Sequence, residues 1–145
     1  MTIDDVRRAR VALAYLFEPG SQALAAALDE LGLVDTLKRI CRGEAASTLV
    51  DVAQQRLAGG DPEPVVDALI ERTTRLGARI VTPEDDEWPR QLDDLRRVSR
   101  ETTRVDRDVF PPVCLWVRGA PSLADVTRRS VAVVGARAST PYGNH

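Results

Sequence analysis

The sequence predicts an α+β fold, in which a helical first half is followed by the first strands of an incomplete α/β unit. Apolar residues recur at helical spacing, between capping residues and glycine stops, up to about residue 77. After Gly77, short β-branched apolar runs replace this spacing, and the last run, residues 131–134, leads into a glycine turn. With 43% apolar residues among 145, the chain can form a packed core.

The first two helices are predicted from their capping residues. Thr2 followed by Asp5 fits a capping signal, and the apolar stripe after it is broken at "EPGS", residues 18–21. Ser21 can cap a second helix, which Gly32 ends. The stripes of the two helices consist of Val6, Leu13 and Phe17, then Leu24, Leu28 and Leu31.

Three more helices complete the first half. Short apolar patterns predict helices over about 34–42 and 47–58. The fifth helix has the clearest boundaries, because Asp61 is its cap, Pro62 its first residue and Gly77 its stop.

The stretch "LAYLFEPGSQALAAALDELG", residues 13–32, is similar to a helix-hairpin-helix motif. Backbone N–H groups in such a hairpin can bind a DNA phosphate. Here, however, Glu18 would repel a phosphate, and residues 1–60 carry 7 basic and 8 acidic groups. We therefore favour plain packing of two antiparallel helices over DNA binding at this hairpin.

The second half begins with a short strand over 78–82, which Pro83 ends. The acidic run 84–87 could hold a divalent ion, but four consecutive acids cannot all point at one site, so we favour a solvated turn. Trp88 and Leu92 can then fix a short turn against the helical half.

Residues 96–108 have mixed charge and no apolar period, which predicts a flexible loop rather than a nucleic-acid contact. A buried strand over 113–119 and a helical turn over 121–126 follow. Residues 131–134 form an uninterrupted β-branched run, typical of a parallel strand covered on both faces.

A candidate anion site follows this run. Gly135 permits a sharp turn, and Thr140 with Pro141 is suited to start a helix, whose free N–H groups bind anions. Arg137 could add a charge-assisted fork to phosphate. The dinucleotide and P-loop fingerprints are absent, so a glycine turn without a ligand stays the alternative. No nucleophile, base, metal set or cofactor motif accompanies the turn, so we expect binding and not an enzyme.

Composition excludes several classes of protein. Twenty basic and 22 acidic residues give a formal charge of −2, so nucleic-acid binding needs a local site. His145, the sole histidine, excludes a histidine triad or zinc site. Cys41 and Cys114 lie far apart and favour reduced, buried thiols. Neither a membrane span nor a signal peptide is seen, so we expect no membrane association and a cytoplasmic location.

Four blocks together resemble the N-terminal part of the DprA/Smf family of bacterial DNA-processing proteins. They are "EPG" at 18–20, "ARIVTPEDDEWPRQL" at 78–92, "PPVCLWVRG" at 111–119 and "VAVVGARASTPYG" at 131–143. The chain departs from the family pattern at Trp88, where Tyr is usual, at Ala136, where Ser is common, and in a long connection between residues 93 and 110.

The resemblance implies a SAM-like helical domain over 1–77 and a linker with the start of an extended Rossmann domain over 78–112. The first strands and phosphate loop of a truncated Rossmann domain would occupy 113–145. It also implies binding of single-stranded DNA, homodimerisation of the full-length protein and loading of RecA during natural transformation. The residues that match the family's first phosphate-binding loop are Gly135, Arg137, Thr140, Tyr142 and Gly143.

Two other functions stay open at this point. The chain could be a Rossmann-like nucleotide- or small-ligand-binding protein of the lysine decarboxylase-like group, or its helical domain could be a protein-interaction module. On the DprA interpretation it looks like the front of a longer protein, so we expect residues 131–134 to be poorly anchored. We also expect the isolated chain to bind oligonucleotides weakly or not at all.

Overall fold

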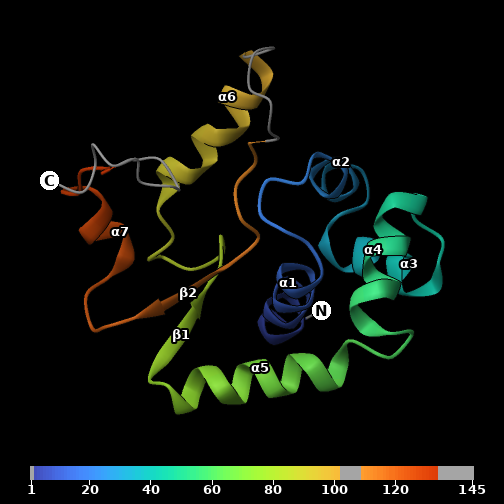
Figure 1. The fold of residues 1–145 in the computed structure, drawn as a ribbon. Helices are drawn as coiled ribbons and strands as arrows, with labels where there is room; N and C mark the ends of the chain where they lie inside the picture. Colours follow the sequence, from blue (N-terminus) through green and yellow to red (C-terminus); the bar gives the residue numbers. More distant parts are fainter. Residues whose placement is uncertain (1, 102–108, 134–145) are drawn as a thin grey trace, which may run out of the picture.

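The computed structural model describes residues 2–101 and 109–133. The described residues form seven α-helices, one 3-10 helix and one two-stranded antiparallel sheet (Figure 1). The α+β class predicted from the sequence is therefore confirmed. The elements in order are α1 (Ile3–Leu16), α2 (Gln22–Leu31), α3 (Leu33–Arg42), α4 (Ser47–Leu57), α5 (Glu63–Arg75), β1 (Ala78–Val81), η1 (Arg90–Asp93), α6 (Asp94–Glu101), β2 (Leu115–Arg118) and α7 (Leu123–Thr127).

The predicted caps of the first two helices are confirmed. The Asp5 N–H donates to the Thr2 hydroxyl at 3.1 Å, and the Thr2 N–H donates to the Asp5 carboxylate at 2.7 Å. The Ser21 hydroxyl accepts from the Leu24 N–H at 3.2 Å. These reciprocal bonds satisfy N–H groups that have no partner inside their helix, which fixes where each helix starts.

The boundaries of α5 also follow its sequence signals. The Glu63 N–H donates to the Asp61 carboxylate at 2.9 Å, while Pro62 already has helical backbone angles. The helix ends before Gly77, whose φ of +63° lies in the left-handed region that glycine adopts without strain.

Helix α1 lies between two groups of elements (Figure 1). On one side it packs with α2, α3 and α4, around a set of buried residues that we call the helical cluster: Leu13, Leu16, Phe17, Leu24, Ile40, Leu49 and Ala53. On the other side it packs with α5 and the sheet through the sheet cluster: Val11, Ala12, Val66, Ile80 and Cys114. One helix thus contributes to both cores, and the strands pack directly against the helical half.

The two strands pair with Ala78 opposite Arg118 and Val81 opposite Leu115. The predicted burial of the second strand is only partly correct, because Trp116 and Arg118 are exposed and alternate with half-buried Leu115 and Val117. A strand with a single described partner has one open edge, so its side chains are not covered as in a central strand.

Two further predictions are wrong within the described residues. Residues 96–101, predicted as part of a loop, belong to α6, which projects away from the rest of the fold (Figure 1). Residues 131–133, predicted to begin a buried parallel strand, form no strand, and Val131 and Val133 are 87% and 93% exposed. Extended backbone becomes a strand only where a partner satisfies its N–H and C=O groups, and no described residue does so here.

Candidate functional site

The predicted phosphate loop lies outside the described residues. This holds for every residue assigned to it, namely Gly135, Arg137, Thr140, Tyr142 and Gly143, and also for His145. The described chain extends to Val133, two residues before the loop begins. The structure therefore shows how the chain upstream of the loop, from β1 to α7, is supported.

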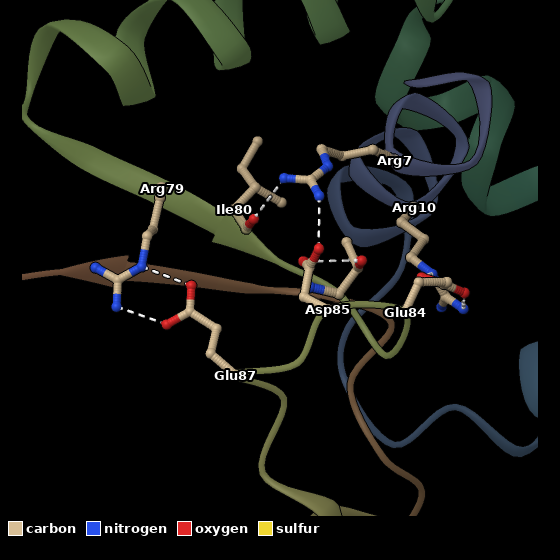
Figure 2. Close-up of polar contacts among 8 residues, drawn as sticks. Arg7, Arg10, Arg79, Ile80, Glu84, Asp85 and Glu87 are labelled. Carbon is tan, nitrogen blue, oxygen red and sulfur yellow. Dashed lines mark hydrogen bonds and ion pairs between the residues drawn. The ribbon is translucent and has the colours of Figure 1, made fainter. Parts of the chain in front are cut away.

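The acidic turn at residues 84–87 forms the centre of that support (Figure 2). Three of its four carboxylates each bind an arginine from α1 or β1. Asp85 and Glu87 are half-buried, so the prediction of a solvated turn is wrong for these two, whereas Glu84 and Asp86 are exposed. The Arg10 guanidinium donates to Glu84 at 2.8 and 2.5 Å, Arg7 donates to Asp85 at 2.7 Å, and Arg79 donates two bonds to Glu87 at 2.7 Å each. We call Arg7, Arg10, Arg79, Glu84, Asp85 and Glu87 the arginine joint.

The joint ties α1 to both strands. Besides its carboxylate, Arg7 donates to the Ile80 carbonyl oxygen at 3.1 Å, at the end of β1. Arg10 donates to the Val113 carbonyl oxygen at 3.0 Å, just before β2. The Asp85 carboxylate also accepts from the Thr82 N–H at 2.7 Å, which closes the turn locally. Bidentate and branched arginine contacts of this kind fix geometry as well as charge.

The same joint holds the segment that leads toward the predicted loop. Arg79 donates to the Gly119 carbonyl oxygen and, at 2.8 Å, to that of Pro121. The Glu87 carboxylate accepts from the Leu123 N–H at 3.3 Å, where α7 begins. The backbone from β2 into α7 is therefore fixed by β1 and the acidic turn.

Pairing changes the acidity of the turn. Hydrogen bonds from Arg79 lower the pKa of Glu87 below its ordinary value. Partial burial acts to raise the pKa of Glu84, but the guanidinium of Arg10 outweighs this effect and the pKa is lowered. The carboxylates of Glu84 and Glu87 are therefore ionised at neutral pH and paired with Arg10 and Arg79. Among the residues that the structure describes, no three histidine, cysteine or acidic side chains are grouped to hold a metal ion.

The hairpin between α1 and α2 uses its polar groups for packing. The Glu18 carboxylate accepts from Arg56 of α4 at 2.5 Å, and the same guanidinium donates to the Tyr15 carbonyl oxygen at 3.0 Å. Ser21 is occupied as the cap of α2. These contacts support the interpretation of the hairpin as a packing element.

A cavity of about 230 Å³ lies between this hairpin and the segment before β2. Its lining includes Phe17, Trp88, Phe110 and Arg96, and Arg96 bridges to Asp29 of α2 at 2.8 Å. Trp88 is 1% exposed and lines this cavity together with Phe17 of the helical half, as its predicted position in the turn requires. Its indole N–H finds no hydrogen-bond partner among the described residues.

Both cysteines are free, and they differ in environment. Cys114 is buried, as predicted, and its thiol lies 3.8 Å from the Arg10 carbonyl oxygen. Burial raises the pKa of Cys114 to about 12, so the thiol stays protonated at neutral pH. Cys41 is exposed, contrary to the prediction of a buried thiol.

No helix among the described residues is both long enough and apolar enough to cross a bilayer. The residues that sequence reasoning missed are those of the arginine joint. Their one sequence signal is the spacing of Arg7 and Arg10, which places two cations on one face of α1.

Comparison with known proteins identifies similar chains in two strains of Mycobacterium tuberculosis, CDC 1551 / Oshkosh and ATCC 25618 / H37Rv. Each is described as a candidate DNA processing protein DprA and is 36% identical over 143 residues, or 99% of this chain. The present chain spans 35% of the length of these relatives. No family model matches the chain, and no solved structure matches it.

Proposed function

We propose that this chain is the N-terminal part of a DprA-like DNA-processing protein that binds single-stranded DNA. The observation that carries the proposal is the 36% identity over 143 of the 145 residues. A match of this extent includes the helical half, the arginine joint and the predicted phosphate loop together.

We assign residues 1–77 to a SAM-like helical domain and residues 78–112 to a linker with the start of an extended Rossmann domain. Residues 113–145 then carry the first strands and phosphate loop of that domain. The sheet cluster supports close association of the two parts, because Val11 and Ala12 of α1 pack with Ile80 and Cys114.

In this proposal the phosphate loop at residues 135–143 binds the sugar–phosphate backbone of the DNA. Gly135 lets the backbone approach the strand closely, and the N–H groups of the helix that begins after Thr140 bind a phosphate. Arg137 adds a two-pronged contact to the same anion. The arginine joint holds residues 119–123, upstream of this loop, through the bonds of Arg79 and Glu87. The chain binds its ligand without hydrolysing it.

The experiment is a titration of fluorescently labelled oligo-dT, with anisotropy recorded over a series of salt concentrations. We expect weak binding that strengthens at low salt. In the complete protein, Arg137→Ala should weaken binding and reduce the slope of log K against log salt by about 0.7, the value for one lost phosphate contact on a single strand. Arg42→Ala removes the same charge from the exposed last turn of α3 and should change neither quantity.

Preference for unpaired DNA is tested by competition with a duplex of the same length. The proposal fails if neither the chain nor the complete protein binds the single strand at any salt concentration, or if duplex competes equally well. If the slope of log K against log salt is unchanged in Arg137→Ala, Arg137 does not contact the DNA.

We propose further that the complete protein forms a homodimer in the cytoplasm and delivers single strands to the RecA recombinase during natural transformation. Sedimentation velocity measures the dimer. The rate of RecA assembly on DNA, with and without the protein, measures delivery. If the complete protein is a monomer and leaves RecA assembly unchanged, the proposed dimer and the proposed delivery are both wrong.

A further inference from the structure

Trp116 is the most exposed aromatic side chain among the described residues. It is 44% exposed, whereas Trp88 is 1% and Phe17 6% exposed, and Tyr15 and Phe110 are half-buried. The sequence contains two tryptophans, two tyrosines and two phenylalanines in all. Large apolar surface is usually covered where the fold can cover it, so an exposed indole in an aromatic-poor chain is a candidate contact residue.

The indole is also held in place. Its N–H donates to the Thr73 hydroxyl of α5 at 3.1 Å. Thr73 is itself 7% exposed, and its hydroxyl donates to the Leu69 carbonyl oxygen at 2.7 Å. The ring is therefore fixed at one end before any ligand arrives, which reduces the entropy that a binding partner must overcome.

Arg118, and two arginines at the end of α5, have no ion-pair partner among the described residues. Arg118 follows Trp116 by two residues on the same face of β2 and lies opposite Ala78. Ala78 lies three residues after the end of α5, the helix that Trp116 contacts through Thr73, and Arg72 and Arg75 in its last turn are exposed. None of these three arginines forms an ion pair with a described residue. By contrast, carboxylates pair with Arg7, Arg8, Arg10, Arg56, Arg79, Arg96 and Arg97.

We propose that Trp116, with Arg118 beside it, is a base-stacking platform for single-stranded DNA, separate from the phosphate loop at residues 135–143. This inference rests on the proposed function. A fixed aromatic face accepts any base, and neighbouring guanidinium groups contact the backbone phosphates, which is how single strands are bound without sequence preference. The arginine joint fixes this platform as well, since Arg79 binds the Gly119 carbonyl oxygen directly after Arg118.

The test is a titration of the wild-type chain with oligo-dT at low ionic strength, followed by NMR of the indole N–H groups. The chain has two indoles, and Trp116→Phe assigns their signals. We expect the Trp116 signal to shift through the ring current of a stacked base, while the signal of buried Trp88 stays in place. An abasic strand of equal length should leave both signals unchanged.

Variants measure the contribution to affinity. Trp116→Ala should weaken oligo-dT binding about tenfold, and Trp116→Phe should retain most of it. An unchanged Trp88 signal in Trp116→Ala shows that the fold is intact. Arg118→Gln should lower the salt dependence, whereas the matched variant Arg42→Gln should not.

The outcomes separate this inference from the proposed function. If oligo-dT binds while the Trp116 signal stays fixed, or Trp116→Ala binds equally well, the platform is overturned and single-strand binding stands. An abasic strand that shifts the Trp116 signal equally also overturns stacking. If neither the chain nor the complete protein binds oligo-dT, the proposed function and the platform fail together. If only the complete protein binds, and its Trp116→Ala variant binds equally well, the platform alone is overturned.

Discussion

The two sides of α1 are held by different forces. On the helical side, Leu13 and Leu16 are fully buried in a large apolar cluster. On the sheet side, a smaller cluster is supplemented by the arginine joint, whose side chains are between 14% and 43% exposed. Apolar burial responds little to pH or salt, whereas partly exposed ion pairs respond to both. Low pH and high salt should therefore destabilise the sheet side of α1, which carries the proposed binding residues, more than the helical side.

The largest effect is expected in the helical cluster. Leu13→Ala removes a fully buried side chain and should lower the free energy of unfolding by about 2–5 kcal/mol, measured by urea denaturation. Ile3→Ala, at a position that is 77% exposed, should stay within about 0.5 kcal/mol of wild type. Equal losses in the two variants would show that α1 is not the centre of a packed core.

The next largest effect is expected at the joint. Asp85→Ala removes the partner of Arg7 and leaves the N–H of nearly buried Thr82 without its acceptor, so stability should fall by about 1–3 kcal/mol. Its neighbour Asp86 is exposed and pairs with no described residue, so Asp86→Ala is the matched control. If urea denaturation gives the same free energy of unfolding for Asp85→Ala and Asp86→Ala, the arginine joint does not stabilise the fold.

The pH dependence of stability should come from the sheet side. The pKa values of Glu84 and Glu87 are lowered in the folded chain, so their contribution is complete above the ordinary value of 4.5 and is lost as pH falls through the lower folded values. Below about pH 4.5, wild type should lose stability more steeply than the double variant Glu84→Gln/Glu87→Gln. Parallel pH profiles would exclude these two carboxylates as the cause.

The smallest effect is expected at the hairpin. Glu18 and Arg56 have side chains that are 80% and 40% exposed, so their ion pair is screened by water. Glu18→Gln should change the free energy of unfolding by about 0.2–1 kcal/mol, with the difference vanishing at high salt. A larger, salt-independent loss in thermal unfolding would mean that the hairpin supports the fold more than its exposure indicates.

The features that the sequence predicted correctly are local ones. Thr2 with Asp5, Ser21, Asp61 and Gly77 each act within a few residues of their own position, so helix boundaries follow from short-range chemistry alone. The identity of the family likewise rests on short blocks of sequence, and similarity over 99% of the chain supports it.

The features that were missed depend on contacts between distant residues. The sequence near the acidic turn predicts a solvated turn, because nothing in it indicates that Arg7 and Arg10 bind there. These two residues are more than seventy positions away in the chain. Helix α6 lacks an apolar period, and Arg96 anchors it through Asp29 of α2. The exposure of Trp116 depends on which neighbours cover β2, a property that composition and periodicity do not encode.

In our proposal, single-stranded DNA binds on the sheet side of α1, through β2 and the segment that follows it. Hydrogen exchange of backbone amides, measured by mass spectrometry with and without oligo-dT at low salt, locates the binding surface. We expect added strand to slow exchange in peptides from residues 113–145 and to leave α2, α3 and α4 unchanged. Slower exchange confined to those three helices, or no change anywhere, would contradict it.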